Sequence, residues 1–262
     1  MGVHRRRCFF ASYRAHYSVL RMKNDIGVVA NVHSTIPCPW LHEKKRKEFK
    51  ISNLNLNIIA NSIVGIAGQS GSGKSTVANL IMGMLEPDSG EISIDGKILD
   101  NQNIKSWQKN IGYVPQSIFL CDGTLKENIA FGIDHKNIDN KLLEKAINLA
   151  ELSGFVDTLP ENIDTRLGER GVQLSGGQQQ RVGIARALYH DPNILIFDEA
   201  TSSLDEDTEK NIMSAINKFS RLKTIIIIAH RTNTLKKCDN IFIFNQGCVI
   251  DNGNFKSLFE KN

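Results

Sequence analysis

The sequence of 262 residues predicts an α/β fold with a mostly parallel core sheet, an antiparallel β subdomain and an inserted helical subdomain. Three short, almost wholly apolar runs, at 62–68, 193–200 and 223–230, indicate buried strands. A helical pattern follows each of the first two, and buried strands that alternate with helices are typical of a parallel sheet. Between about residues 117 and 187 the pattern changes to helices and loops, which predicts the inserted subdomain.

Two other segments alternate apolar and polar residues, the pattern of strands with one exposed face. They are ISNLNLNI (51–58) and EISIDG (91–96), and they predict the antiparallel subdomain. KSTVANLIMGMLE (74–86) has helical spacing, and the turn residues PDSG end it. NIGYVPQ (110–116) predicts one further strand.

The inserted segment and the C-terminal part contain the remaining predicted elements. KLLEKAINLAEL (141–152) is an amphipathic helix, and RVGIARALYH (181–190) predicts the helix that closes the insertion. DEDTEKNIMSAINKF (205–219) predicts a helix after the second buried run. NIFIFNQG and CVIDNG (240–253) predict a closing hairpin, and NFKSLFEKN (254–262) a last short helix.

The net charge of +4 is unevenly distributed along the chain. Residues 1–50 contain eleven lysines and arginines against three acidic residues, and the remainder contains 21 against 25. We therefore expect residues 1–48 to form an atypical basic leader, poorly ordered, and residues 49–262 to form the main folded domain. The cluster HRRRCFF (4–10), near the start of the leader, could alternatively bind a membrane surface or nucleic acid.

Cysteine usage and hydropathy exclude several classes of protein. The five cysteines are scattered and form no CxxC pair, which argues against a zinc site or a disulfide framework and fits a reducing cytosol. The most apolar run, TIIIIAH (224–230), is far shorter than the ~20 residues that a membrane crossing needs.

GQSGSGKS (68–75) matches the phosphate-binding pattern GxxxxGK[ST] in full, with an apolar strand before it and a helix after it. It predicts a P-loop NTPase. Glycines let backbone N–H groups converge on phosphate oxygens at a helix N-terminus. Lys74 adds a positive charge at the β- and γ-phosphates, and Ser75 offers a hydroxyl to Mg²⁺. The predicted nucleotide-binding residues here are Gly68, Gln69, Ser70, Gly71, Ser72, Gly73, Lys74, Ser75 and Thr76.

ILIFDE (194–199) supplies the acidic end of a buried strand that such a site requires. Asp198 is predicted to hold Mg²⁺ through water, and Glu199 to polarise the attacking water. An acidic pair after a strand is commonly only the start of a loop, but together with the phosphate loop it is the expected Walker B element.

The stretch GVQLSGGQQQRVGIARALYH (171–190) places two glycines just inside a predicted helix, behind Ser175 as a candidate cap. Each glycine costs about 1 kcal/mol relative to alanine, so something must approach that backbone closely. LSGGQ (174–178), with the phosphate loop and FDEATSSLD (197–205), resembles the ATP-binding domain of an ABC transporter. The resemblance runs from about Phe49 to the C-terminus, and it implies that residues 49–262 are an ABC ATPase domain.

The resemblance implies ATP and Mg²⁺ as ligands and a head-to-tail homodimer that sandwiches two ATP molecules. The signature loop of one subunit would face the γ-phosphate bound by the other, with the helix dipole pointing at it. ATP should therefore hold the dimer together, and hydrolysis should loosen it. The signature residues are Leu174, Ser175, Gly176, Gly177 and Gln178.

Three further residues match positions of the family. Gln116 resembles the Q-loop glutamine, which senses Mg²⁺ and the attacking water, and His230 resembles the switch histidine that contacts the γ-phosphate. With Glu199 they form the implied catalytic set. Asp205 resembles the D-loop residue at the dimer interface, and it is also a candidate N-cap for the helix that follows.

TRLGERG (165–171) and GTLKENIAFG (123–132) resemble the segments of exporters that meet the membrane domain, with Glu169 as a contact. The implied protein is the ATP-binding and ATP-hydrolysing subunit of an exporter. It would lie at the cytoplasmic face of the membrane, held by a membrane-spanning subunit or domain. Because Glu199 is present and both motifs are intact, one chain could build two equivalent sites.

The chain also departs from the family. No membrane helices precede the ATPase motifs, and residues 1–48 show neither a recognisable first strand nor the usual tyrosine loop that stacks on adenine. Trp40 lies near that position, where it could stack on adenine or simply pack.

Two other functions stay open beside the exporter: a soluble, non-transport ABC ATPase and a non-functional exporter fragment. ABC proteins that act on DNA or ribosomes usually have tandem ATPase domains or a coiled-coil insertion, and neither is visible. No nucleic-acid partner is therefore expected. The transported substrate does not follow from this sequence.

Overall fold

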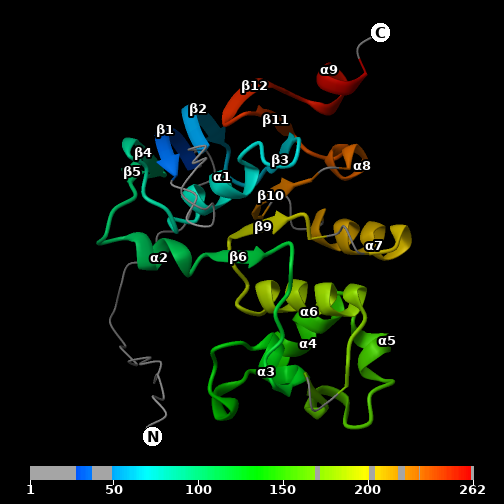
Figure 1. The fold of residues 1–262 in the computed structure, drawn as a ribbon. Helices are drawn as coiled ribbons and strands as arrows, with labels where there is room; N and C mark the ends of the chain where they lie inside the picture. The colour runs from blue at the N-terminus through cyan, green and yellow to red at the C-terminus, as the bar shows by residue number, and fades with distance from the viewer. Residues whose placement is uncertain are drawn as a thin grey trace, which may run out of the picture.

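The computed structural model describes residues 28–36, 49–168, 172–200, 204–217, 222–229 and 231–260. In the described residues, a core sheet lies between an antiparallel sheet at the upper left of Figure 1 and a helical part below it. The predicted fold class, with a mostly parallel core sheet, an antiparallel subdomain and inserted helices, is confirmed.

The core sheet has the strand order β12-β11-β3-β10-β9-β6. All its neighbouring strands are parallel except the β11–β12 pair. Because the carboxyl ends of parallel strands meet at one edge, the loops after β3, β9 and β6 come together. The strands are β3 (Ile63–Gly68), β6 (Ile111–Val114), β9 (Ile194–Asp198), β10 (Thr224–Ile228), β11 (Asn240–Asn245) and β12 (Cys248–Gly253).

Both faces of the core sheet are buried, which explains the unbroken apolar runs of the sequence. Leu195 and Phe197 of β9 pack into one hydrophobic core, whereas Ile194 and Ile196 pack into a second core on the opposite face. The first core contains α3, α4 and α6, and the second contains α1 and the antiparallel sheet.

The antiparallel sheet has the order β2-β1-β4-β5, with β2 at Phe49–Ile58, β4 at Ser89–Ile94 and β5 at Lys97–Ile98. Strand β1 (Val28–Ile36) pairs with β2 on one side and β4 on the other. The prediction that residues 1–48 contain no recognisable first strand is therefore wrong. β1 was missed because its short VVANVHSTI pattern sits in a basic region and its stability comes from long-range pairing on both sides.

The helical part contains α3 (Leu125–Ile129), α4 (Asn140–Leu149), α5 (Ser153–Val156) and α6 (Gly176–Tyr189). Two short 3₁₀ helices, η1 (His135–Asn137) and η2 (Asn162–Asp164), and the strand pair β7 (Gly123–Thr124) and β8 (Arg166–Leu167) complete it. Helix α6 packs against α3, α4 and β6, so it joins the helical part to the core sheet.

Helix α1 (Lys74–Ile81) is shorter than the predicted span of 74–86. Gly83 has a left-handed φ of 65°, and Met84 N–H donates to Asn79 O at 2.8 Å while Gly83 N–H donates to Leu80 O at 3.0 Å. This is the Schellman arrangement that ends helices at a glycine. The other helices are α2 (Ile104–Gln108), α7 (Glu206–Asn217), α8 (Thr232–Leu235) and α9 (Phe255–Phe259).

The longest helix among the described residues, α6, has 14 residues. Within the described ranges, no helix combines the length and the apolar character that crossing a bilayer requires.

Candidate nucleotide-binding site

The loop between β3 and α1 is held in a shape that only glycine allows at two of its positions. A Cβ on Gly68 would lie 2.3 Å from Phe244 O and 2.7 Å from Ser72 Oγ. Gly71 has a φ of 76°, and nothing lies within 4 Å of where its Cβ would be. The first glycine is thus needed for close packing, and the second leaves open space beside the loop for a ligand.

The N-terminus of α1 opens toward this loop. Gly73 is its N-cap, with a left-handed φ of 105°, and no side chain caps the first turn. The first N–H groups of a helix without a side-chain cap are donors for an anion, and the helix dipole favours negative charge there.

Lys74 places a positive charge under the same loop. Its Nζ donates to Gly68 O at 3.0 Å and to Gln69 O at 2.9 Å, and the residue is only 5% exposed. Burial lowers the pKa of Lys74, and the nearby Glu199 and Asp198 carboxylates oppose that shift. The ammonium is therefore positioned by the loop itself and balanced by two acids.

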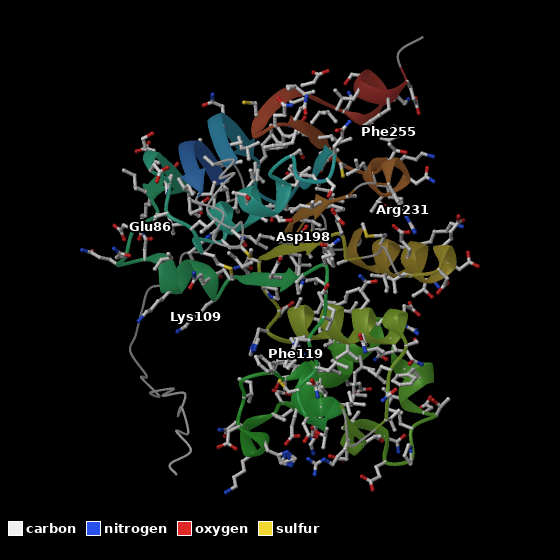
Figure 2. All side chains as sticks on the ribbon, viewed as in Figure 1. Glu86, Lys109, Phe119, Asp198, Arg231 and Phe255 are labelled. Carbon is white, nitrogen blue, oxygen red and sulfur yellow. The ribbon has the colours of Figure 1, made fainter. Side chains whose placement is uncertain are left out.

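Asp198, at the end of β9, is 4% exposed and lies near the centre of the molecule in Figure 2. Burial raises the pKa of Asp198, whereas a hydrogen bond from Ser75 lowers it. Tyr113 Oη also donates to Asp198 Oδ2, at 3.4 Å. Burial, followed by the Asp198 charge, raises the pKa of Tyr113 to about 12.

The donor set around Asp198 fits a hard divalent cation of the Mg²⁺ type. The Ser75 hydroxyl and the Asp198 carboxylate are within hydrogen-bond reach of each other, and both are oxygen ligands. Over the described part of the chain, no group of three or more His, Cys, Asp or Glu residues could hold a metal on its own. Mg²⁺ here would take its remaining ligands from water and from a bound phosphate.

Glu199 and Gln116 meet beside this pair. Gln116 Nε2 donates to Glu199 Oε2 at 2.8 Å, although the two residues lie 83 positions apart in the chain. Glu199 has a left-handed φ of 52°, and its N–H donates to Ile228 O at 2.9 Å. A non-glycine residue held in that region is strained, a feature that clusters at functional sites.

A cavity of about 270 Å³ lies between the phosphate loop, the first turn of α1 and the Gln116–Glu199 pair. Of the predicted nucleotide-binding residues, Gly68, Gln69 and Ser72 support the loop outside this lining. The cavity is lined by Ser70, Gly71, Gly73, Lys74, Ser75, Thr76, Gln116 and Glu199.

The signature residues occupy a separate surface of the chain, at the start of α6. Ser175 is the N-cap: its Oγ accepts from Gln178 N–H at 3.3 Å, and Gln178 Oε1 accepts from Ser175 N–H at 2.8 Å. Gly176 and Gly177 form the first two helical positions, and Leu174 is buried. None of these residues lines the cavity at Lys74 in the same chain.

The remaining predicted residues are placed as follows. Asp205 caps α7 by accepting from Thr208 N–H at 2.9 Å, as its N-cap interpretation predicted, and this bond lowers the pKa of Asp205. Trp40, Glu169 and His230 lie outside the described residues.

Sequence reasoning missed Tyr113, which contacts the predicted Mg²⁺ ligand. It stands on β6 opposite Ile196 of β9, two residues before Asp198. A hydroxyl within an otherwise apolar strand, three residues before Gln116, was the available signal.

Comparison with known proteins gives the same picture. The family model described as ABC transporter matches residues 51–202. ABC transporter B family member 21 of Arabidopsis thaliana is 42% identical over 204 residues, covering 78% of this chain and 16% of that protein. The ATP-dependent lipid A-core flippase of Vibrio parahaemolyticus is 36% identical over 246 residues, covering 94% of this chain and 41% of the flippase.

Among solved structures, a bacterial Atm1-family ABC exporter with ATP bound matches with a TM-score of 0.81 and 34% identity. The match covers 95% of this chain and 42% of the exporter. The chain thus spans less than half the length of these relatives. Family model, sequence relatives and structural match agree, and this chain belongs to the ABC transporter family, with an ATP-binding domain of the exporter type.

Proposed function

We propose that this chain binds and hydrolyses ATP as the nucleotide-binding part of an ABC exporter. The observation that carries the proposal is the Gln116–Glu199 pair, joined at 2.8 Å on the wall of the cavity that Lys74 and the phosphate loop also line. A carboxylate and an amide facing a cationic, glycine-rich loop are the groups that water activation at a phosphate requires.

Different residues of the chain would bind different parts of the nucleotide. The N–H groups of the loop and of the first turn of α1 would bind the phosphates, and Lys74 would neutralise the β- and γ-phosphate charge. Ser75 and Asp198 would hold Mg²⁺, which when bound neutralises charge that develops on the phosphate oxygens. Trp40 is the candidate for stacking on adenine.

Glu199 is the proposed general base of hydrolysis. Its strained backbone and the bond from Gln116 fix the carboxylate at the cavity wall, where it would accept a proton from the attacking water. Gln116 would orient that water and Glu199 together, and His230 would contact the γ-phosphate. Because Gln116 begins the segment that continues to Phe119, it also connects the site to the helical part.

The signature turn, residues 174–178, is proposed to complete the site of a second copy. Its glycines begin α6 and have no side chains to block a phosphate, and the helix dipole favours the anion. Head-to-tail pairing would bring this turn to the cavity at Lys74 of the partner, with Asp205 at the interface. Each copy would contribute half of two equivalent sites.

The partner for transport would be a membrane-spanning subunit or domain, which would keep the chain at the cytoplasmic face of the membrane. The candidate contact is a cavity of about 320 Å³ between residues 118–120 and residues 172–174, beside Phe119, whose surface is 75% exposed. An exposed aromatic residue at the rim of a hollow is typical of a protein interface.

Two substitutions test the proposal. Lys74→Ala should weaken ATP binding about 10- to 100-fold, because a charged hydrogen-bond partner of the phosphates is lost. Glu199→Gln should retain ATP binding but lower the hydrolysis rate by about 10²- to 10⁴-fold, because the general base is lost. Isothermal titration and phosphate release measure the two effects.

Glu206→Gln is the matched control, since Glu206 is 85% exposed on α7 and lies outside the cavity lining. It should leave both binding and hydrolysis unchanged. Normal hydrolysis by Glu199→Gln would show that another group activates the water.

A further inference from the structure

One arginine connects the helix that starts with the signature turn to the segment that carries Phe119. Arg186 of α6 donates through Nη1 to Phe119 O at 3.0 Å and through Nε to Asn128 O at 2.8 Å. Its Nη2 donates to Asn128 Oδ1 at 3.3 Å, and its guanidinium lies 4.9 Å from the centre of the Phe131 ring. A single side chain thus contacts Phe119, Asn128 and Phe131 of residues 119–131, called here the clamped segment.

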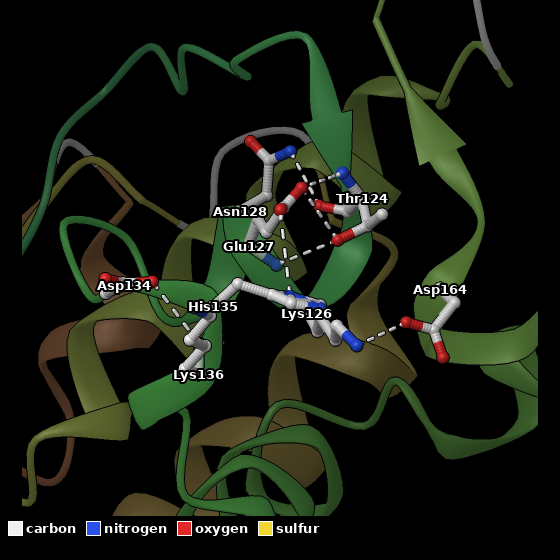
Figure 3. A network of polar contacts seen from close by, with 8 residues as sticks. All are labelled: Thr124, Lys126, Glu127, Asn128, Asp134, His135, Lys136 and Asp164. Atoms are coloured by element: carbon white, nitrogen blue, oxygen red, sulfur yellow. Dashed lines mark hydrogen bonds and ion pairs between the residues drawn. The ribbon is translucent and has the colours of Figure 1, made fainter.

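Asn128 links different parts of the clamped segment through hydrogen bonds. It is 1% exposed, and its Oδ1 accepts from Cys121 N–H at 2.9 Å. Its Nδ2 donates to Cys121 O and to Thr124 O, each at 3.0 Å. Thr124 and Glu127 form a capping box at the start of α3, as Figure 3 shows. Arg186 therefore binds a segment that its own side-chain hydrogen bonds already hold together.

Ile118, the residue just before the clamped segment, also packs against α6. A Cβ on Gly183 would lie 2.3 Å from Ile118 Cδ1 and 2.8 Å from Ile118 Cγ1, so the missing side chain leaves the space that Ile118 fills. Gly183 and Arg186 are three residues apart and lie on one face of α6. The packing of Ile118 and the hydrogen bonds of Arg186 thus attach neighbouring parts of the chain to the same face of α6.

The two ends of α6 serve different surfaces. Its N-terminus is the signature turn, proposed to face ATP on a second copy, and Arg186 lies ten residues further along, about 15 Å away at the rise of an α-helix. Helix α6 packs on α3, α4 and β6, and a packed helix is one of the rigid elements that can carry coupling between two sites.

We propose that Arg186 is the positioning residue that makes the clamped segment and the signature helix move as one body. A partner that engages Phe119 would then displace the signature turn, and closure of the signature turn on ATP would displace Phe119. This inference rests on the proposed ATP sandwich and names the residue that connects it to the partner surface. Arg186 itself touches neither the phosphate loop nor the signature turn.

Hydrogen exchange followed by mass spectrometry tests the connection on the full chain. In the Glu199→Gln background, Mg²⁺ and ATP should slow amide exchange at residues 174–178 and, through Arg186, at residues 119–131. In Glu199→Gln/Arg186→Ala, the signature turn should still respond, while the ATP-dependent slowing of the clamped segment should fall below about twofold. Arg186→Lys keeps the positive charge but not the several N–H donors of the guanidinium, so most of the ATP-dependent slowing at residues 119–131 should be lost. This variant serves as the test if the alanine variant fails to fold.

Lys126→Ala is the matched control. Lys126 lies within the clamped segment and pairs with Asp164 at 2.5 Å, a link to η2 that does not involve α6 (Figure 3). This variant should keep the ATP response at residues 119–131. An undiminished response in both Arg186 variants would overturn the inference alone. Absence of any ATP response at residues 174–178 in every variant would instead contradict the ATP sandwich, and with it this inference.

Discussion

At the scale of single residues, the site concentrates features that cost stability and that a purely structural loop would avoid. Asp198 is buried with a raised pKa, and Glu199 beside it has a left-handed backbone. Asp198 is the last residue of β9 and Glu199 follows it, which places both at the carboxyl edge of the sheet. Costs of this kind are expected where a cation and a phosphate compensate them on binding.

Asp198→Asn should raise the melting temperature of the nucleotide-free chain at pH 7 and abolish the Mg²⁺-dependent part of ATP affinity. Because the folded pKa of Asp198 is raised, the ionised carboxylate is less favourable in the folded than in the unfolded state. The difference between the two proteins should shrink as the pH falls through the raised pKa toward the usual aspartate value. Calorimetric melts from pH 7 down to about pH 4, near the usual aspartate value, and ATP titrations with and without Mg²⁺, measure both effects. A variant less stable at pH 7 would contradict this interpretation.

Two glycines of the phosphate loop should respond differently to alanine. Gly68→Ala would drive a Cβ against the Phe244 carbonyl, so it should destabilise the fold by about 2 kcal/mol or more. Gly71→Ala meets open space and should cost only about 1–2 kcal/mol of left-handed strain, yet it should weaken ATP binding because its Cβ enters the phosphate space. Urea unfolding and ATP titration separate the two effects. Equal losses of stability would contradict the assigned roles.

At the scale of secondary-structure elements, helix α6 combines a local cap with a proposed binding surface. Its capping box of Ser175 and Gln178 satisfies the N-terminal donors when the chain is alone. The same serine and the two glycines after it are proposed to face a phosphate of the second copy. The cap therefore keeps the helix start formed before the second copy arrives.

Ser175→Ala should lower the free energy of unfolding by about 1 kcal/mol, the usual cost of losing a cap, and reduce hydrolysis beyond what that loss explains. Asp139→Ala is the matched control: Asp139 caps α4 by accepting from Lys141 and Leu142 N–H groups, away from the cavity at Lys74. It should lose similar stability and keep its hydrolysis rate. Equal rates of ATP hydrolysis in the two variants, measured below saturation with ATP, would show that Ser175 does not contribute to the site.

How well each element could be predicted depended on where its stability comes from. β3, β9 and β10 are buried on both faces, so their own residues show the strand. β1 depends on pairing with β2 and β4, which no local pattern contains. In the candidate site, Gln116 and Glu199 were predicted separately and do lie together, because β6 and β9 are adjacent parallel strands. The contact of Tyr113 with Asp198 could not be predicted, because it depends on the register between β6 and β9. A contact with a second copy cannot be predicted from a single chain either.

At the scale of the whole molecule, the phosphate loop and the signature turn belong to different surfaces of the chain. The loop opens on the cavity at the edge of the core sheet. The turn instead begins α6, the last helix of the helical part (Figure 1). One copy alone therefore provides a site for phosphates without the signature glycines. Two copies arranged head to tail would complete both sites at once, which makes ATP part of the interface.

Mass measurement by light scattering tests this central claim most directly, with the Glu199→Gln variant and Mg²⁺-ATP. We expect a particle of about twice the 29.2 kDa chain mass that forms only when ATP is present and returns to the single-chain mass when ATP is removed. A chain that is saturated with ATP and still has the single-chain mass at high protein concentration would contradict the account.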